Sequence, residues 1–310
     1  MNLIVTNKKD NYYENCKSHL TIKLKTGINW YEIDDREQYP DEEFRTFDVK
    51  EFFDKIINLD HYSLQEFTHF RISLRYTPKI NKYYHPDFEL IMSEKYYLFD
   101  IKTIRKFKIK INSNYIKWVC YQNRIDILEW WKNSGLKLEY DETALDYASS
   151  KGHVNVLEWW KHSGLPLKYS SNSIDDASRN GHINVLEWWK NSGLPLEYSD
   201  DALDSASGKR NVSVLDWWKN SGLELKYSDK ALCNASAWGH IKVLNWWKNS
   251  GLELKYSDDA LYEASYWDHI KVLKWWKNSG LPLKCDKYDK EHMGKNALKL
   301  WRKNKLLMHN

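Results

Sequence analysis

The sequence predicts a mostly α-helical solenoid of stacked helix pairs, preceded by a small α+β N-terminal domain. Three features recur every 29 residues without insertion or deletion: a pair of tryptophans, a glycine and an alanine. A fixed period of this size is typical of a solenoid, in which each unit buries its apolar face only against its neighbours. The tryptophan pairs are Trp130–Trp131, Trp159–Trp160, Trp188–Trp189, Trp217–Trp218, Trp246–Trp247 and Trp275–Trp276; the glycines are Gly135, Gly164, Gly193, Gly222, Gly251 and Gly280; and the alanines are Ala148, Ala177, Ala206, Ala235 and Ala264.

The composition indicates an intracellular, reducing compartment. The residues from Met1 to Lys9 have no apolar core of a secretory signal, and no apolar run is long enough to cross a membrane. The four cysteines are scattered and form no C-x-x-C pair, which argues against a zinc site and against a disulfide framework. The net charge of +4 is modest and does not by itself require a nucleic-acid partner.

Residues 1–86 read as the small α+β domain. Val5 and the alternating residues Leu20–Leu24 have strand character, and so do His69–Tyr76, which end at Thr77–Pro78. Phe47–Ile57 places apolar residues at helical spacing, with Asp48 as its expected N-cap.

This domain shows no motif that carries chemistry. His61, His69 and His85 are not at metal-ligand spacing, and there is no H-E-x-x-H, G-x-S-x-G or glycine-rich phosphate loop. The acidic run Glu32–Glu37 is read as a solvated loop. No nucleophile–base pair can be nominated, so we expect no catalytic residue, no metal ligand and no cofactor, and a protein that is not an enzyme.

Residues 87–110 are predicted to form a degenerate first repeat that caps the array. Its two helices would contain Phe88, Leu90 and Ile91, and then Leu98 to Phe107. A cap is needed because a terminal repeat has one face without a neighbour.

Residues 111–285 contain six repeats, each a helix, a tight turn, a second helix and a loop. In the unit Glu142–Tyr169, the first helix starts at Thr143 and the turn lies at Gly152–His153. Serines and aspartates favour the start of later first helices, with Ser199, Ser228 and Ser257 as expected N-caps. The recurring glycine after the second helix is expected at positive φ, and the small alanine lets the tryptophans of a neighbouring helix approach. Each tryptophan can bury ~200 Å², worth roughly 5 kcal/mol before entropy is subtracted.

The stretch T-A-L-D-Y-A-S-S-K-G-H-V-N-V-L-E-W-W-K-H-S-G-L, residues 143–165, resembles an ankyrin repeat. Thr143–Leu145 stand where that family has T-P-L, Ala148–Ser149 where it has A-A, and Gly152–His153 where it has G-H. The likeness covers about 180 residues. The period is about four residues shorter than the family's, so the hairpin fingers are expected to be shortened, with little or no strand. The double tryptophan and the short unit resemble the ankyrin-like families of giant amoeba-infecting DNA viruses, which would place the protein in host cytoplasm or virion.

The resemblance implies a concave groove lined by the first helices. The residues just before the turn vary between units, while the other repeated positions serve packing and capping. Exposed aromatic and basic side chains of this kind are typical of binding hot spots. The alternative is that the aromatic ones cover the end of the array against residues 286–310. The candidate partner-binding residues are Trp238, Trp267, Tyr266, Tyr262, Lys151, Arg179 and Lys209.

The histidines of the turns could in principle bind metal or sense pH, but the resemblance implies that each hydrogen-bonds the turn. They are His153, His182, His240 and His269. The unit turns at Asn123–Arg124, Arg210–Asn211 and Asp268–His269 depart from the Gly-His pattern.

Residues 286–310 are predicted to form a C-terminal capping helix with Lys and Arg outward, although Trp301 does not fall on the 29-residue register. The expected function is a non-enzymatic scaffold that binds another protein, for example one of a host, with no small-molecule substrate and no membrane partner. Two alternatives stay open: a catalytic or modifying N-terminal domain with repeats that recruit substrate, and nucleic-acid binding through the basic tail.

Overall fold

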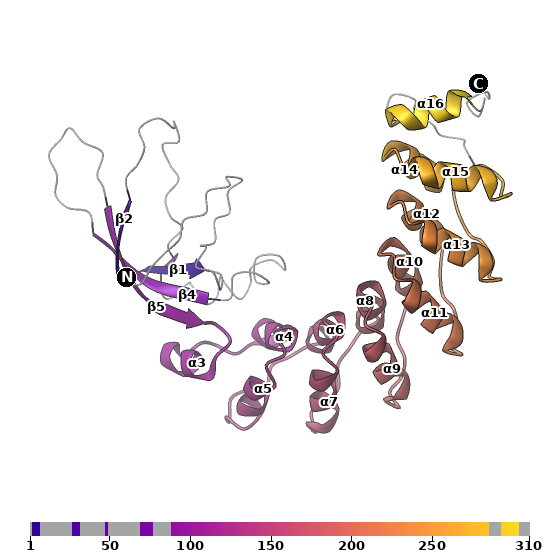
Figure 1. Cartoon of the computed structure of the whole chain (residues 1–310). Coiled ribbons are helices and arrows are strands. Elements are labelled where there is room, and N and C mark those ends of the chain that lie inside the picture. Colours follow the sequence, from indigo (N-terminus) through magenta and orange to yellow (C-terminus); the bar gives the residue numbers. More distant parts are fainter. Residues whose placement is uncertain are drawn as a thin grey trace, which may run out of the picture. The chain divides into compact units, whose positions relative to one another are not determined.

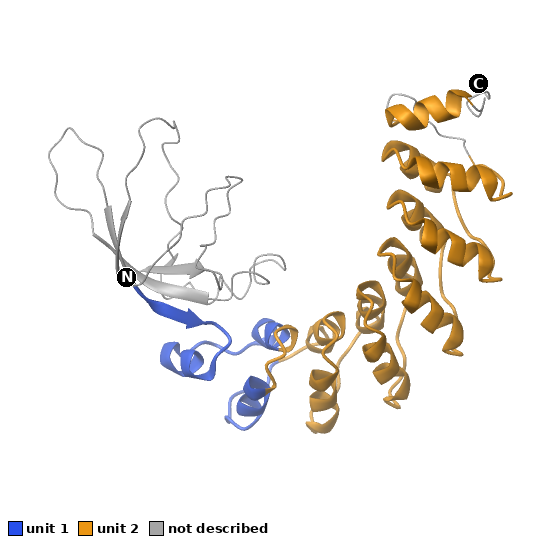
Figure 2. Cartoon of the chain, viewed as in Figure 1, with its two compact units in different colours: residues 1–119, 126–139 blue, residues 120–125, 140–310 orange. Residues whose placement is uncertain are grey.

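The computed structural model describes residues 2–6, 27–31, 47–48, 69–76, 88–284 and 293–303. The chain divides into two compact units (Figure 2): the first contains residues 1–119 and 126–139, and the second contains residues 120–125 and 140–310. This division cuts through the first repeat. The boundaries predicted from the sequence at residues 86, 110 and 285 stay predictions.

The first unit contains a five-stranded antiparallel sheet. Its strands lie in the order β2-β5-β4-β1-β3, so β4 is the central strand and pairs with β5 on one side and β1 on the other. The strand predicted at His69–Tyr76 is confirmed as β4, and Val5 lies in β1, while Leu20–Leu24 fall outside the described residues. The strands are β1 (Asn2–Thr6), β2 (Gly27–Tyr31), β3 (Phe47–Asp48), β4 (His69–Tyr76) and β5 (Phe88–Tyr97).

Two helices predicted for this unit are wrong where the structure describes them. Phe47 and Asp48 pair with Leu3 and Asn2 of β1, so Asp48 stands in a strand and does not begin a helix; residues 49–57 fall outside the described residues. Phe88–Tyr97 was expected to be helical and forms β5, which pairs with β2 on one side and β4 on the other. Hydrogen bonds along both edges of this strand outweigh an apolar spacing that also fits a helix.

The remainder of residues 87–110 forms one helix, α3 (Ile101–Phe107). Asp100 caps it, because the carboxylate Oδ2 accepts the Thr103 backbone N–H at 3.1 Å. Lys108 ends it in the left-handed conformation, with φ of 52°. The expected pair of capping helices is therefore a strand followed by a single helix.

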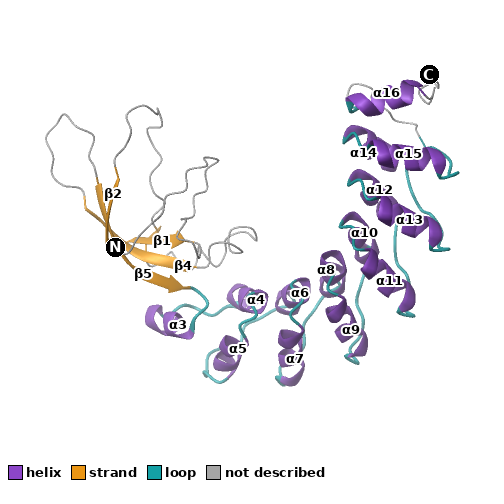
Figure 3. Ribbon diagram, in the orientation of Figure 1, coloured by secondary structure: helices purple, strands orange, loops and turns teal. Residues whose placement is uncertain are grey.

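The repeats are helix pairs joined by loops (Figures 1 and 3). Within the second unit the first helices of successive pairs lie side by side along one edge of the stack, and the second helices lie along the other. Residues 101–284 contain no strand, so the expected shortening of the fingers is confirmed. The first helices are α4 (Ser113–Tyr121), α6 (Thr143–Ser150), α8 (Asn172–Asn180), α10 (Asp201–Gly208), α12 (Lys230–Ala237) and α14 (Asp259–Tyr266); the second helices are α5 (Ile125–Lys132), α7 (Val154–His162), α9 (Ile183–Asn191), α11 (Val212–Asn220), α13 (Ile241–Asn249) and α15 (Ile270–Asn278).

The second tryptophan of each pair is the centre of the core. All six are almost completely buried, and in the second unit each indole lies edge-on to the first tryptophan of its pair at 5.0–5.2 Å. A tyrosine of the preceding loop packs on the same ring at 4.7–4.8 Å. The paired indoles therefore lie within the stack, as the repeat pattern predicted.

Glycine after the second helix is required by backbone conformation alone. Gly164 has a φ of +76°, and a Cβ added there would meet no heavy atom within 4 Å. At Gly152, in the turn between the helices, φ is +77° and a Cβ would lie 2.8 Å from His182 Nδ1. The turn glycine thus serves both the positive φ and the close approach of the next unit.

Turns that lack this glycine keep the same conformation. Asn123, Arg210 and Asp268 have φ of 56°, 63° and 58°, in the left-handed region that costs an L side chain about 1 kcal/mol or more. Asparagine and aspartate tolerate this region better than arginine does, so Arg210 is the most strained of the three.

Replacing Arg210 with glycine is expected to raise the free energy of unfolding by about 1 kcal/mol, because the left-handed φ then carries no steric cost. Urea unfolding followed by circular dichroism measures the change. The control is Asn123→Gly, which should give a smaller gain; a loss of stability in Arg210→Gly would contradict the strain.

The last described helix, α16 (Lys295–Lys303), packs on α14 and α15. Ala297 and Trp301 are buried, and the Trp301 Nε1–H donates to Ser265 Oγ at 2.9 Å. The Asp268 carboxylate accepts the backbone N–H of Ala297 at 2.7 Å, which caps the start of the helix from the preceding turn. Trp301 is off the 29-residue register, yet it occupies the place of the second tryptophan of a further unit.

Candidate functional site: the variable rim of the first helices

The variable rim consists of the two residues at the end of each first helix in the second compact unit. These residues differ from one 29-residue repeat to the next, whereas the residues around them recur. Four of them are C-caps with φ between −104° and −83°. The pairs are Ser150–Lys151, Arg179–Asn180, Gly208–Lys209, Ala237–Trp238 and Tyr266–Trp267.

The aromatic members of the rim are exposed. Trp238 is 65% exposed, Trp267 60% and Tyr266 45%, and the other large hydrophobic side chain exposed among the described residues is Leu136 at 47%. These two indoles differ from the tryptophan pairs of the repeats, in which the second tryptophan is almost completely buried and the first is buried or half-buried. Trp238 and Trp267 therefore remain available at the ends of the adjacent helices α12 and α14.

Three aromatic rings of α14 form one cluster. Tyr262 and Tyr266 stack at 6.4 Å, and the edge of Tyr266 meets Trp267 at 5.1 Å. The Trp267 Nε1–H donates to the Glu263 carboxylate at 3.1 Å. These contacts hold Tyr266 and Trp267 in place while both rings stay exposed, and Tyr262 is half-buried.

The basic members lie at the same positions in the earlier units. Lys151 Nζ is 4.4 Å from the centroid of the Tyr121 ring, a cation–π contact, while Arg179 pairs with Asp176 at 3.6 Å. Lys209 is exposed at the end of α10. The rim thus changes along the array from cationic side chains at α6, α8 and α10 to aromatic ones at α12 and α14.

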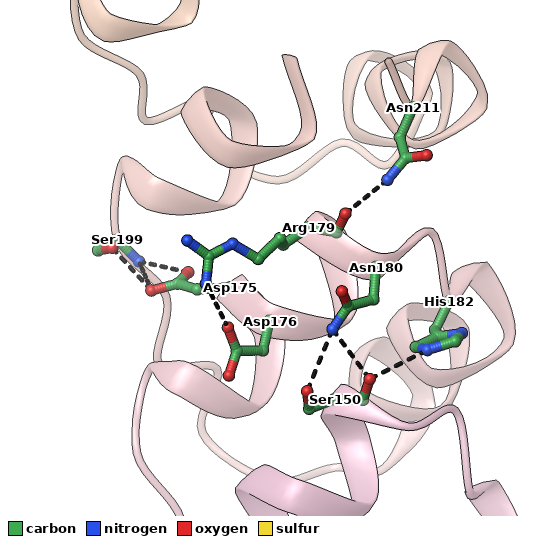
Figure 4. Close-up of polar contacts among 8 residues, drawn as sticks. All are labelled: Ser150, Asp175, Asp176, Arg179, Asn180, His182, Ser199 and Asn211. Atoms are coloured by element: carbon green, nitrogen blue, oxygen red, sulfur yellow. Dashed lines mark hydrogen bonds and ion pairs between the residues drawn. The ribbon is translucent and has the colours of Figure 1, made fainter. Parts of the chain in front are cut away.

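Hydrogen bonds between successive repeats fix the positions of the rim residues relative to one another (Figure 4). The His182 Nε2 lies 3.1 Å from the Ser150 carbonyl, and the Asn180 amide donates to the same carbonyl at 2.9 Å. Asn211, which replaces histidine in its unit, donates to the Arg179 carbonyl at 2.6 Å. His153, His240 and His269 make the equivalent bond at 3.0–3.1 Å. The resemblance implied a bond to the turn; each histidine instead bonds a carbonyl at the end of the first helix of the preceding repeat, which joins each turn to that helix.

A buried aspartate in the first helices forms a second series of bonds between units. Asp175 accepts the backbone N–H of Ser199 at 3.0 Å and its hydroxyl at 2.7 Å, and Asp146 and Asp204 bind Ser170 and Ser228 in the same way. The hydroxyls of Ser199 and Ser228 also accept the backbone N–H two residues ahead. Ser257 does not repeat this bond; its hydroxyl lies 3.3 Å from the Cys233 thiol, which replaces the aspartate. The prediction of serine N-caps is wrong, because the N-cap residues of α10, α12 and α14 are Asp200, Asp229 and Asp258, each one position after the predicted serine.

Burial shifts the pKa values of the aspartates and histidines that join the repeats. It raises the pKa of Asp175 and of Asp204, an effect that hydrogen bonds from Ser199 and Ser228 partly offset. It lowers the pKa of His153, His182 and His240 below the ordinary value of 6.5, and the nearby charges of Lys151 and Arg210 act in the same direction. The histidines are therefore neutral donors to the carbonyls at neutral pH.

Lowering the pH from above 7 to below 6 is expected to destabilise the array. A histidine whose folded-state pKa is depressed binds a proton more tightly when unfolded, so its stabilisation is complete above about 6.5 and is lost as the pH falls through that value. The variant His153→Asn/His182→Asn/His240→Asn, which gives these turns the residue that Asn211 supplies in its own unit, should lose this dependence. Urea midpoints at a series of pH values measure it; parallel curves for the two proteins would contradict the role of the histidines.

The described residues contain no cluster of three His, Cys, Asp or Glu side chains able to hold a metal ion. Cys120 and Cys233 are buried thiols, and burial raises the pKa of Cys120 to about 12, which leaves it a poor nucleophile. In the first unit a depression of about 500 Å³ is lined by Arg105, Glu129, Trp130, Asn133, Ser134 and Leu136. Arg105 lies 5.7 Å from the Trp130 ring there, and the residue set includes no nucleophile–base pair. No helix in the described residues has the length and apolar composition needed to cross a bilayer.

Comparisons with known proteins agree with the repeat pattern. Residues 116–159 match the family model "Ankyrin repeats (many copies)". The crystal structure of the human ASB11 ankyrin repeat domain is similar with a TM-score of 0.42 and 14% identity, over 59% of this chain and 90% of that one. No curated protein matches the chain. The affiliation with giant-virus proteins stays a prediction. The matched segment spans the first helix pair and most of the second. Its tryptophan pair, turn and glycine recur in register through α15, so the later helix pairs repeat the pattern of the segment that is similar to ankyrin repeats.

Proposed function

We propose that the chain is a non-enzymatic scaffold that binds a partner protein through the variable rim, on the concave face formed by the first helices. Ankyrin repeats generally mediate contacts between proteins, and the match at residues 116–159 supports this class of function. The observation that carries the proposal is the exposure of Trp238, Tyr266 and Trp267 at positions that differ between repeats, whereas the second tryptophan of every pair is buried.

Energetics favour these rings as anchors. Trp and Tyr are enriched among residues whose truncation costs an interface about 2 kcal/mol or more, because each buries a large rigid surface at a small cost in conformational entropy. The cluster of Tyr262, Tyr266 and Trp267 is held by its own ring contacts, so little further ordering is needed on binding. Lys151, Arg179 and Lys209 would add charge complementarity at the other units.

Quantitative affinity capture followed by direct binding tests the proposal. The wild-type chain is compared with Trp238→Ala/Trp267→Ala and with Leu136→Ala, which removes an exposed apolar side chain outside the rim. We expect at least one captured protein to be lost only from the rim variant, and the purified pair to bind at least about 30-fold more weakly by calorimetry. Identical captured proteins for all three chains would refute the rim as the binding site.

The N-terminal alternative has no observation in its favour. Most of residues 1–86 fall outside the described part of the chain, and a catalytic or modifying role for that domain stays a prediction from the sequence.

A further inference from the structure

The outer surface of the last three second-position helices is basic. The place that Trp301 takes makes α16 equivalent to a second helix: four residues before Trp301 lies buried Ala297, just as buried Val272 lies four residues before Trp276 in α15. Three positions on the outer surface of each second helix can therefore be compared from α7 to α16. They lie five and two residues before the buried second tryptophan, or Trp301 in α16, and one residue after it.

The net charge at these three positions changes along the array from zero to positive. In α7 they are Asn155, Glu158 and Lys161, and α9 and α11 repeat this balance of one carboxylate and one lysine. In α13 they carry two lysines, Lys242 and Lys248, and in α15 they carry Lys271, Lys274 and Lys277. In α16 they are Asn296, Lys299 and Arg302. The balanced rows of the earlier helices thus become two, three and two positive charges on consecutive helices.

No carboxylate on these helices offsets the charge. The sequences of α13, α15 and α16 contain no Asp or Glu. On the adjoining α11, Asp216 accepts the Trp246 Nε1–H at 2.6 Å, and on the α14 side Asp268 binds the start of α16. We call the surface made by six of these seven cations, all of them exposed, the basic face: Lys242, Lys248, Lys271, Lys274, Lys299 and Arg302.

We infer that the basic face binds the phosphate backbone of duplex nucleic acid, without reading its sequence. Helices packed about 8–10 Å apart spread these cations over about 20 Å, which corresponds to the phosphates of about six base pairs. Such concentration of charge is not a property of the whole chain, whose net charge is only +4. Lysine and arginine rows supply charge contacts and no pattern of base recognition.

Two other polyanions fit the surface less well. Binding into the headgroup region of a bilayer uses apolar side chains beside the cations, and the exposed large hydrophobic residues of the described chain, Leu136, Trp238, Tyr266 and Trp267, all lie off these helices. Single strands stack their bases on free aromatic rings. Trp246 and Trp275 are half-buried, lie edge-on to their buried neighbours at 5.1 Å and are hydrogen-bonded to Asp216 and Asn245, so neither is a fully exposed ring.

The test measures binding of the full chain to a fluorescein-labelled duplex of about 20 base pairs by fluorescence anisotropy, between about 50 and 200 mM salt. The variant Lys242→Asn/Lys271→Asn/Lys274→Glu gives α13 and α15 the residues that α9 carries at these positions, Asn184 and Glu187. The control Lys161→Glu/Lys190→Glu removes the same amount of charge from α7 and α9. Circular dichroism checks that all three chains are folded.

The wild type should bind the duplex with an affinity that falls steeply with salt. The basic-face variant should bind at least about tenfold more weakly at low salt, and its salt slope should decrease by about one for each lost lysine. The control and the rim variant Trp238→Ala/Trp267→Ala should bind the duplex within about twofold of wild type. Duplex binding by the basic face is thereby distinguished from partner binding by the variable rim. Equal losses in the control and the basic-face variant, no binding by the wild type, or binding only to phosphatidylserine-containing vesicles would overturn the proposal.

Discussion

Trp218→Ala is expected to lower the free energy of unfolding by about 4 kcal/mol, because truncating a fully buried indole leaves a large cavity. The Trp218 ring is completely buried, packs on Tyr198 at 4.8 Å and on Trp217 at 5.2 Å, and its Nε1–H donates to the buried Ser178 hydroxyl at 3.0 Å. The alanine would also leave that hydroxyl without its donor. Urea unfolding of the full chain followed by circular dichroism measures the loss.

Trp217→Ala is the matched control. Trp217 is the neighbouring residue of the same helix, it is only half-buried, and its Nε1–H bonds to Glu187 near the surface at 2.5 Å. We expect a loss of about 1–2 kcal/mol for this variant. Equal losses for the two tryptophans would show that burial does not distinguish their roles. Because a repeat array can unfold in parts, the transition should be followed with more than one probe.

Gly152→Ala is the second large effect, with an expected loss of about 3 kcal/mol. The added Cβ would stand at a positive φ and would lie 2.8 Å from His182 Nδ1, so His182 would have to move away from the Ser150 carbonyl. The backbone strain and the lost hydrogen bond between repeats both lower the free energy of unfolding. Urea unfolding followed by circular dichroism measures this loss.

Gly164→Ala isolates the backbone contribution. Its φ of +76° is almost the same as that of Gly152, but the Cβ would meet nothing within 4 Å, so only the conformational cost of about 1 kcal/mol is expected. If the two alanine variants were equally stable, the close approach of His182 to the turn would contribute nothing. If Gly164→Ala cost more than Gly152→Ala, the assignment of the two glycines would be reversed.

The repeats could be predicted closely from the sequence because their determinants are local. The spacing of the tryptophans, the glycine at Gly164 and the small residue at Ala148 each specify a helix face, a helix end or a close contact within one unit or between adjacent ones. The strands of the sheet were harder to predict from the sequence. Phe88–Tyr97 has an apolar spacing that suits a helix or a strand, and only its two distant partners, β2 and β4, decide between them.

Several groups that join the units were missed, although each had a signal. Asp146, Asp175 and Asp204 are 29 residues apart, and so are Ser149, Ser178, Ser207, Ser236 and Ser265, which bind the indoles. A small polar residue repeated inside an apolar helix face indicates a buried partner. Trp301 had no such signal, because it follows a shortened connection and reaches Ser265 only through the packing of α16.

By itself the sequence determined the period, the helix pairs, the left-handed turns and the residues that vary between units, since all of these follow from short-range sterics and apolar spacing. Tertiary structure decided which strand pairs with which, which carboxylates and hydroxyls satisfy the buried indoles, and that the cations of α16 continue those of α13 and α15. The physical reason is separation along the chain. The hydrogen bonds between repeats join residues 24 to 40 positions apart, and the pairs of β1 with β4 and of β2 with β5 join residues 57 to 71 positions apart, so tertiary packing, and not local preference, selects the partner.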